Sequence, residues 1–259
     1  MKLYFFEAGV LKSQKQYFTL GEGVGEPFTV PVPFLLIEHP RGIVLFDTGN
    51  APEVIDSKHE HWGEATKAYD PVMTKDQCCV NAIRKIGLKP EGVKYVILSH
   101  LHLDHAGCVG YFPNAKYIVH REELCYAYVP DHFMKSAYIR KDFDKPVEWI
   151  LLDGWRDATF DLFGDGRITT FFTPGHTPGH QSLLLRLHNT APLLFAADAC
   201  YTTENLEDNR LPGLAWSFGE VVLSIERMKR LRETTGAQII PGHDPEAWKN
   251  IRLAPEYYD

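Results

Sequence analysis

The chain reads Ser99-His100-Leu101-His102-Leu103-Asp104-His105-Ala106-Gly107 directly after an apolar run from Val93 to Leu98. Four side chains that can bind a metal ion therefore stand within six residues, after a segment that reads as a buried strand. Burying four ionisable groups together is costly without a compensating charge, and a metal ion supplies one. The spacing therefore predicts metal binding. His100 and His102 can point the same way if the strand continues, whereas the adjacent Asp104 and His105 diverge and can reach a second ion.

Three later segments each place a histidine or an aspartate just after a strand-like run. They are Thr173-Pro174-Gly175-His176, Ala197-Asp198 and Pro241-Gly242-His243-Asp244. Side chains at strand ends lie on one rim of a sheet, where rigid strands support them and loops shape a pocket. Two strand-rich halves, roughly residues 1–110 and 160–243, both contribute residues of this kind.

The combined set holds five histidines and two aspartates, enough for two metal ions that share a bridging ligand. Imidazole and carboxylate donors without cysteine suit zinc, while iron, cobalt and manganese stay open. The candidate metal ligands are His100, His102, Asp104, His105, His176, Asp198 and His243.

The rest of the chain alternates between strand and helix patterns, with a first strand at the N-terminus. Apolar runs at 34–37 and 43–46 flank Pro40-Arg41-Gly42 and predict a strand pair around a turn. Further strands are predicted at 93–98, 117–119, 168–172, 182–187, 193–197 and 238–240. Residues 121–160 are rich in aromatic and charged side chains and are not assigned.

Two helices are predicted from capping pairs. Thr74 with Gln77 indicates one helix start, and Ser217 with Glu220 indicates another helix that ends at Gly236. The apolar positions are Val80, Ile83 and Ile86 in the first, and Val221, Ile225, Met228 and Leu231 in the second.

Composition restricts the partners and the compartment. The 259 residues carry a formal net charge of −7, which disfavours nucleic-acid phosphates and anionic membranes as partners. No apolar run approaches the ~20 residues that span a bilayer, and Glu7 interrupts the N-terminal apolar residues too early for a secretory core. Five cysteines without a CxxC pair argue against a disulfide framework. No linker marks a boundary, so we expect one domain over residues 1–259 in the cytoplasm.

The order of the candidate ligands, HxHxDH and then single His, Asp and His residues, resembles the metallo-β-lactamase superfamily. The segments FDTG at 46–49 and TPGHTPGH at 173–180 look like its other characteristic motifs. Within the superfamily, the closest resemblance is to the N-acyl-homoserine lactone hydrolases, the quorum-quenching lactonases. It rests on the wording HLHLDHAG, on Tyr201 three residues after Asp198, and on PVPF at 31–34 before the first hairpin. The similarity covers nearly the whole chain, including 138–144 and 242–244.

This resemblance implies an α/β fold, a four-layer αβ/βα sandwich of two mixed sheets flanked by helices, with the metals at the rim between the halves. It implies that one metal is held by His100, His102 and His176, the second by Asp104, His105 and His243, and that Asp198 bridges them.

The resemblance also implies a reaction on a small acylated lactone. A hydroxide bridging the two metals attacks the lactone carbonyl while one metal polarises the carbonyl oxygen. Tyr201 hydrogen-bonds the substrate carbonyl as charge develops, and Asp104 passes a proton to the leaving alkoxide. Relatives in this group often dimerise, which leaves a homodimer open.

Other residues receive supporting or structural interpretations. His180 is interpreted as at most a residue that contacts a metal ligand without binding the metal. Asp47 is interpreted as a residue that fixes a turn or orients a ligand histidine. Cys108 and Cys200 are interpreted as small buried thiols. The histidines interpreted as surface or packing residues are His39, His59, His61, His120, His132 and His188. An acyl chain needs an apolar groove, for which the candidates are Trp62, Tyr69, Phe133, Met134 and Tyr138.

Other functions fit the sequence less well. Hydroxyacylglutathione hydrolases share the metal residues but bind glutathione through basic side chains near the C-terminus, where the tail IRLAPEYYD offers only Arg252. This ester or thioester hydrolase is the alternative.

A nuclease is disfavoured by the negative charge, and a β-lactamase by the full HxHxDH set and the expected lack of an export signal. A diiron oxygen or nitric-oxide reductase commonly replaces His102 by a carboxylate and carries a flavin domain, and we expect none after Asp259. A non-catalytic scaffold would lose ligands, and none of the seven is lost.

Overall fold

The first sheet grows from a long antiparallel pair at the N-terminus. β1 (Lys2–Gln14) pairs with β2 (Pro27–His39), and a turn returns the chain into β3 (Gly42–Phe46). From β3 onward the neighbours are parallel, and the seven strands lie in the order β4-β1-β2-β3-β5-β6-β7. Its other strands are β4 (Asp70–Val72), β5 (Val93–Ile97), β6 (Lys116–His120) and β7 (Glu148–Leu152). The structure is a computed structural model that describes residues 1–155 and 157–259.

The second sheet comes from the C-terminal half, in the order β12-β11-β10-β9-β8. Its pairs are antiparallel except for β11 and β12, which are parallel, so this sheet is also mixed. Its strands are β8 (Thr159–Asp161), β9 (Ile168–Phe172), β10 (Gln181–Leu185), β11 (Leu193–Ala197) and β12 (Gln238–Pro241).

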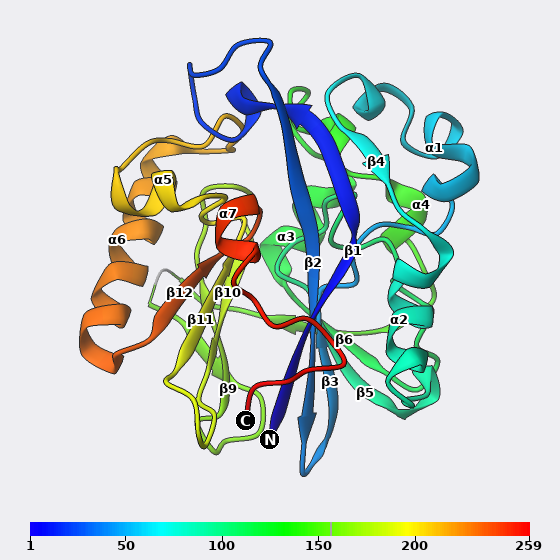
Figure 1. Cartoon of the computed structure of the whole chain (residues 1–259), viewed down its shortest axis with the longest axis vertical. Coiled ribbons are helices and arrows are strands. Elements are labelled where there is room, and N and C mark those ends of the chain that lie inside the picture. Colours follow the sequence, from blue (N-terminus) through cyan, green and yellow to red (C-terminus); the bar gives the residue numbers. More distant parts are fainter. Residues whose placement is uncertain (156) are drawn as a thin grey trace.

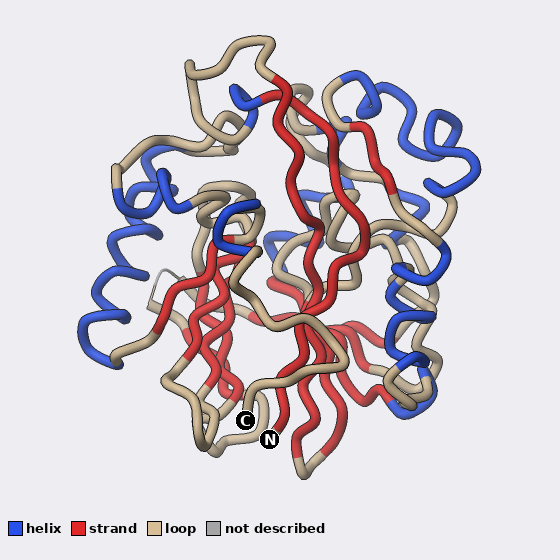
Figure 2. Tube along the Cα trace, viewed as in Figure 1, coloured by secondary structure: helices blue, strands red, loops and turns tan. Residues whose placement is uncertain are grey.

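Helices cover the outer face of each sheet, as Figures 1 and 2 show. In Figure 1 the long α6 lies outside the second sheet, and α1, α2 and α4 lie outside the first. The helices are α1 (Val54–Trp62), α2 (Cys79–Lys85), α3 (Arg121–Tyr128), α4 (Arg140–Phe143), α5 (Thr203–Glu207), α6 (Phe218–Thr235) and α7 (Pro245–Trp248). Short 3₁₀ turns occupy Lys15–Tyr17, Gly63–Lys67, Lys75–Gln77, Pro90–Gly92 and Lys135–Ala137.

The alternation of side chains along β2 explains the layering. Leu35 and Ile37 point between the two sheets, whereas Phe34 and Leu36 point to the helices outside the first sheet. Successive residues of a strand face opposite sides, so a continuous apolar run serves two cores. A third core lies between the second sheet and α6. The predicted four-layer αβ/βα sandwich of two mixed sheets is therefore confirmed.

Strand direction brings several strand ends to one rim. β10 is antiparallel to both β9 and β11, and β11 is parallel to β12. The carboxyl ends of β9, β11 and β12 therefore share one edge of the second sheet. β3 and β5 are parallel as well, so their carboxyl ends share an edge of the first sheet.

Most predicted elements are confirmed, with one helix corrected. The hairpin of β2 and β3 and the helix capped by Ser217 and closed by the left-handed Gly236 are as expected. The capping pair Thr74 and Gln77 exists, but it caps only a 3₁₀ turn, because Cys78 adopts an extended ψ of 131° before α2 begins. The strand expected at 182–187 is displaced to Gln181–Leu185. The unassigned segment 121–160 supplies α3, α4, β7 and the beginning of β8.

The two chain ends meet beside the first sheet. Leu3 forms a bridge with Tyr258, and the Ala254 amide donates to the Phe5 carbonyl oxygen. Figure 1 shows the N- and C-termini next to each other. Within the described residues, none of the helices combines the length and the apolar character needed to cross a membrane.

The core between the sheets predicts a large loss of stability when it is emptied. The ring of the buried Phe195 packs edge-on against Phe5 and Phe46. We expect Phe195→Ala to lower the free energy of unfolding by about 3–5 kcal/mol, because it leaves a cavity between the sheets. Phe133→Ala, at a side chain 59% exposed, is the matched control and should change it by no more than ~0.5 kcal/mol. Equal midpoints and slopes for both variants in denaturant unfolding would contradict this packing.

Candidate metal centre

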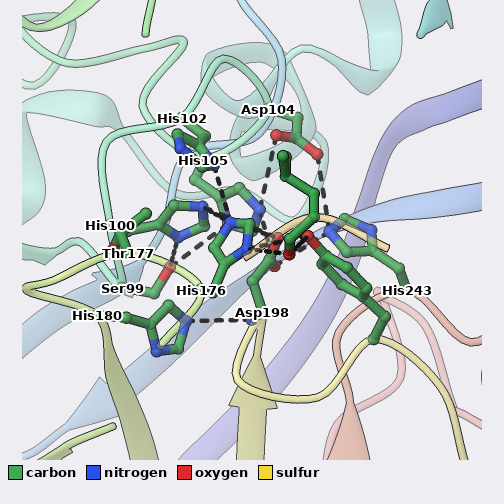
Figure 3. Close-up of polar contacts among 12 residues, drawn as sticks. Ser99, His100, His102, Asp104, His105, His176, Thr177, His180, Asp198 and His243 are labelled. Atoms are coloured by element: carbon green, nitrogen blue, oxygen red, sulfur yellow. Dashed lines mark hydrogen bonds and ion pairs between the residues drawn. The ribbon is translucent and has the colours of Figure 1, made fainter. Parts of the chain in front are cut away.

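Five strand ends deliver buried polar side chains to the rim between the sheets. Asp47 follows β3, His100 follows β5, His176 follows β9, Asp198 follows β11 and His243 follows β12. All five are at most 4% exposed. Figure 3 shows the candidate ligand side chains pointing toward one another around Asp198. The rim expected from the sequence is thus formed, and it joins residues from both halves of the chain.

His100, His102 and His176 form one group of ligand atoms. The His176 Nε2 atom lies 3.1 Å from His100 Nε2 and 2.8 Å from His102 Nδ1. All three histidines are essentially buried. Their atoms are close enough to hold one metal ion together.

Asp104, His105 and His243 form a second group that could hold a metal ion. The Nε2 atoms of His105 and His243 each lie 3.7 Å from one of the two carboxylate oxygens of Asp104. The same two Nε2 atoms each lie 3.1 Å from Asp198 Oδ1. This group is therefore joined to Asp198 on its inner side.

Asp198 stands between the two groups. Its Oδ2 atom lies 3.3 Å from His176 Nε2 and 3.8 Å from His100 Nε2, while Oδ1 faces His105 and His243. One carboxylate thus presents one oxygen to each group, which is the position a bridging ligand needs. The structure brings all seven predicted ligands together.

The outward nitrogens of His100 and His105 are held by a short hydrogen-bonded chain. His105 Nδ1 donates to Asp47 Oδ2 over 2.9 Å, and Ser99 Oγ donates to the same carboxylate oxygen over 2.8 Å. His100 Nδ1 lies 2.9 Å from Ser99 Oγ and donates to it. Such bonds fix the tautomer and leave the Nε2 lone pairs facing inward. The expectation that Asp47 orients one of these histidines agrees with this contact.

His176 and His243 are held in the same manner by other parts of the chain. His243 Nδ1 donates to the Pro31 carbonyl oxygen over 2.8 Å. His176 Nδ1 lies 2.9 Å from the Tyr201 hydroxyl, which in turn donates to the Leu214 carbonyl oxygen over 3.3 Å. Tyr201 therefore does two things: it lines the pocket, and it supports His176 from behind.

The protonation preferences of the first group fit a bound cation. Burial lowers the pKa of His100 and His102 well below the usual value, and the positive charge of neighbouring histidines lowers it further. Burial also lowers the pKa of His176 to about 4. Three neutral imidazoles then converge at close range, and their facing nitrogens offer lone pairs that a metal ion satisfies.

The acidic side of the site is electrostatically opposite. Burial opposes protonation of His105, but the charges of Asp198, Asp104 and Asp47 raise its pKa well above the usual value. Burial likewise opposes ionisation of Asp198, yet the charges of His105 and His243 hold its pKa well below the usual value. The first group therefore offers neutral imidazoles and Asp198 an ionised carboxylate, whereas the aspartates favour a proton on His105, which a divalent metal would displace on binding.

Backbone strain marks two of the strand ends. Asp47 and Ala197 both have positive φ angles, 59° and 47°, although neither is a glycine. The backbone at Ala197 also passes so close to Gly242 that a Cβ there would lie 2.5 Å from the Ala197 carbonyl oxygen. Strain of this kind persists where surrounding structure holds the chain for function. Here it aims Asp198 and His243 at the same point.

His180 supports Asp198 and belongs to none of the three ligand groups. Its Nε2 atom accepts the Asp198 backbone N–H over 3.1 Å, and its Nδ1 atom lies 2.9 Å from Thr173 Oγ1. The placement beside a ligand agrees with the sequence interpretation.

The remaining histidines and cysteines have surface or packing roles. His39 pairs with Asp165, His61 pairs with Asp142, and His120 caps α3. His59, His132 and His188 lie at the surface. Cys108 and Cys200 are buried thiols, as expected.

A small pocket opens onto both groups. Its lining joins site residues to apolar side chains, namely Leu11, Phe18, Tyr69, His102, Leu103, Asp104, Ala137, His176, Asp198, Tyr201, Leu214 and His243. Of the predicted groove residues only Tyr69 lines it. Trp62, Met134 and Tyr138 are instead buried in the core, and Phe133 is exposed. None of these four side chains lines the pocket, so these four assignments are wrong.

Sequence reasoning missed several residues at or beside the site, among them Phe18, Leu214 and Glu123. Phe18 packs edge-on against the rings of Tyr201 and His243, and Leu214 contacts Tyr201 through its carbonyl oxygen. Glu123 lies in the unassigned segment and reaches the loops of both sheets. No spacing in the sequence marks them, because they approach the site only through tertiary folding.

The sandwich and the paired ligand groups define a class of protein, and comparison with known proteins agrees. The family model for the Metallo-beta-lactamase superfamily matches residues 28–243. Over its full length the chain is 48% identical to the N-acyl homoserine lactonase AttM of Rhizobium radiobacter, covering 98% of that protein. It is 31% identical to the N-acyl homoserine lactonase AiiA of Bacillus thuringiensis subsp. kurstaki, over 99% of this chain and 98% of that protein.

Solved structures agree with these relatives. An N-acyl homoserine lactone hydrolase with the product N-hexanoyl-L-homoserine bound at its catalytic metal center superimposes with a TM-score of 0.90 at 30% identity. The match covers 99% of this chain and 98% of that one. The chain belongs to the metallo-β-lactamase superfamily and, within it, to the N-acyl homoserine lactonase family, which confirms the resemblance stated from the sequence.

The bridging position of Asp198 predicts the metal content of a variant. We expect Asp198→Asn to lose both metal ions more readily, because the amide offers a neutral oxygen to one group and an N–H₂ donor to the other. The measurement is metal-to-protein stoichiometry after dialysis against a weak chelator. Asp165→Asn is the control, since Asp165 also pairs with a histidine but belongs to neither group. Metal content and rate equal to wild type in Asp198→Asn would remove Asp198 from the centre.

Proposed function

We propose that this chain is a metal-dependent hydrolase that opens the lactone ring of N-acyl homoserine lactones and so quenches quorum sensing. The observation that carries the proposal is the pocket: five of the seven clustered histidines and aspartates line it, and the rest of its lining is largely apolar. Relatives with full-length matches carry the name N-acyl homoserine lactonase. If the lactone ring binds beside the ligand groups, the acyl chain contacts the apolar wall of the pocket.

We propose that His100, His102 and His176 hold one divalent ion, that Asp104, His105 and His243 hold the other, and that Asp198 bridges them. Zinc suits this cysteine-free donor set, and cobalt, iron or manganese are the alternatives. When bound, such a pair supplies a nucleophile at neutral pH and Lewis-acid polarisation of the carbonyl.

Asp104 is proposed to manage the proton of the reaction. It lines the pocket, and burial raises the pKa of its carboxyl group. A carboxyl group poised nearer neutrality can take up a proton and later deliver it from its oxygen to the leaving alkoxide. Ring opening releases this alkoxide from the lactone, and protonation completes the hydroxy acid.

Tyr201 is proposed to hydrogen-bond the substrate carbonyl from the opposite wall. Burial raises the pKa of its hydroxyl group well above the usual value, so it stays a donor at neutral pH. Its present acceptor is the Leu214 carbonyl oxygen at 3.3 Å, a long bond that a developing oxyanion can replace. The contact of Tyr201 with His176 fixes the position from which it donates.

The apolar wall fits the acyl part of the substrate. Leu11, Phe18, Leu103, Ala137 and Leu214 line the pocket beside the ligand groups. Tyr69 adds a second tyrosine, whose pKa is raised by burial and by the charges of Asp104 and Asp198. An apolar wall with a few polar groups is the usual form of a small-molecule site.

The alternative is a hydroxyacylglutathione hydrolase or another ester hydrolase, because the same metals would attack those substrates. Glutathione carries two carboxylates and needs cationic partners. The only basic side chain of the C-terminal tail is Arg252, and it stacks over Tyr258 at 4.0 Å from the ring centroid. This occupied position favours the lactone.

We further propose that residues 1–259 act as a single domain, in the cytoplasm, and possess the surface for a homodimer. The chain ends pair beside the first sheet, which supports one folding unit. Unpaired cysteines suit a reducing compartment. Exposed Trp216, Val222 and Leu223 near the start of α6 favour a partner surface. Light scattering in solution tests the homodimer, and cell fractionation tests the cytoplasmic location.

The proposed activity predicts metal-dependent acid release. Wild-type protein of known metal content should hydrolyse a short and a long N-acyl homoserine lactone in a pH-indicator assay. Turnover should vanish on chelation and return with zinc or cobalt, because the nucleophile depends on the ions. A thioester of glutathione is the comparison substrate. If the protein binds two metal ions and hydrolyses the thioester but not the lactones, it is a hydroxyacylglutathione hydrolase or a related ester hydrolase instead.

The two pocket tyrosines should separate in kinetics. We expect Tyr201→Phe to keep both metal ions and to lower kcat/KM about 10- to 100-fold, the usual cost of a lost hydrogen bond to a charged group. Tyr69→Phe is the matched control for removing a hydroxyl from the same pocket, and we expect a smaller loss. An unchanged kcat/KM in Tyr201→Phe would reduce Tyr201 to a packing residue.

A further inference from the structure

Glu123 is a fully buried carboxylate in the first turn of α3, and four groups donate hydrogen bonds to it. Its Oε1 atom accepts the Leu101 backbone N–H over 2.9 Å and the Tyr138 hydroxyl over 3.0 Å. Its Oε2 atom accepts the Thr177 hydroxyl over 2.5 Å and the Gly179 backbone N–H over 3.3 Å. None of these five residues is a candidate metal ligand.

The two oxygens of Glu123 connect two different loops. Leu101 lies between His100 and His102 in the loop after β5 of the first sheet. Thr177 directly follows His176 in the loop after β9 of the second sheet. One carboxylate thus joins the two loops that carry the whole first ligand group. These are the loops whose histidines His102 and His176 approach each other, with 2.8 Å between His102 Nδ1 and His176 Nε2.

The surroundings of Glu123 are shaped to admit this side chain. A Cβ atom on Gly179 would lie 2.2 Å from the Glu123 amide nitrogen and 2.4 Å from its Cβ atom, so only glycine fits there. Tyr138, the third partner, also packs its ring edge-on against His102 at 4.5 Å between centroids. The TPGHTPGH motif therefore contains a histidine for the site and, one and three residues later, two donors for Glu123.

The chemistry of the four partners requires an acceptor at both oxygens. Each oxygen accepts from one backbone N–H, of Leu101 or Gly179, which can only donate, and a carboxylate accepts from all four partners at once. Burying a carboxylate costs free energy that a neutral side chain would not. Among the described residues, no lysine, arginine or histidine forms an ion pair with Glu123 that offsets this cost.

We propose that Glu123 is a positioning residue that locks the loop of His100 and His102 to the loop of His176 and so sets the metal affinity of the first ligand group. The inference rests on the proposed function only in that these three histidines bind a metal ion. Partners that orient metal ligands in this way are typically worth 10- to 100-fold in metal affinity. The second group, Asp104, His105 and His243, has no hydrogen bond to Glu123 among the described residues and should be unaffected.

Glu123→Gln tests the proposal with a change of one atom. The amide keeps one accepting oxygen but turns an N–H₂ donor toward the backbone N–H of Leu101 or of Gly179, which cannot accept, so the hydrogen bond to one of the two loops is lost. The apoprotein is reloaded with two equivalents of Zn²⁺ and titrated with a coloured zinc chelator. Wild type should release both ions at high chelator concentration, whereas Glu123→Gln should release one ion about 10- to 100-fold more easily and hold the other as wild type does.

The pair Thr177→Val and Thr177→Ser isolates the hydrogen bond if Glu123→Gln fails to fold. Valine has the shape of threonine without the hydroxyl, so it should loosen one Zn²⁺ ion. Serine keeps the hydroxyl and should restore wild-type zinc affinity. A merely structural role for this contact would lower the thermal stability of Thr177→Val without splitting the two zinc affinities.

Asp142→Asn is the matched control, because Asp142 is another buried carboxylate, paired to His61 at 2.8 Å outside the ligand groups. It should lower stability and leave both zinc affinities unchanged. Wild-type zinc affinities in both Glu123→Gln and Thr177→Val would overturn the proposal. The measurement contains no substrate, so a protein that binds zinc as expected but does not hydrolyse lactones would contradict the proposed function and not the role of Glu123.

Discussion

The structure depends on one electrostatic arrangement, a buried aspartate between two groups of histidines. Asp198 presents Oδ2 to His176 and Oδ1 to His105 and His243, at 3.1–3.3 Å. These side chains are at most 4% exposed, so each depends largely on partners inside the protein. Neutral imidazoles on one side and aspartates on the other give the site the lone pairs and the negative charge that metal ions require. The two sheets supply the rigid edges that hold this arrangement open to a pocket.

Precision at such a site comes from the groups behind the ligands. Asp47, Ser99, the Pro31 carbonyl oxygen and Tyr201 each contact the outward nitrogen of a histidine. These contacts come from strand β2 and from several loops, so no single element positions the site. The inter-sheet core keeps the loops in register, because its apolar side chains pack β2 and β3 against β10 and β11 directly below the rim. Stability and function are therefore coupled: a shift between the sheets would separate the ligand groups.

The sequence predicted the hairpin, α6 and the ligand set well, since each has a strong local signal. Capping pairs, apolar periods and a dense HxHxDH motif are properties of neighbouring residues. The helix start predicted at Thr74 was wrong, because Cys78 interrupts the helical backbone after one 3₁₀ turn and α2 begins only at Cys79. The acyl-groove candidates failed for a different reason. Aromatic residues in loops serve either a core or a pocket, and only the path of the loop decides between them.

The sequence by itself determined which side chains carry the chemistry and that they follow strands, because metal ligands and strand ends leave their mark in composition and short spacing. Tertiary structure alone decided how His100 and His102 meet His176, residues 74 to 76 positions apart, and which oxygen of Asp198 faces which group. It also decided the walls of the pocket and the role of Glu123, a residue that nothing in its neighbourhood distinguishes from a surface glutamate of a helix. The physical reason is that hydrogen bonds and packing between distant segments depend on how the two sheets pack against each other, which local patterns do not encode.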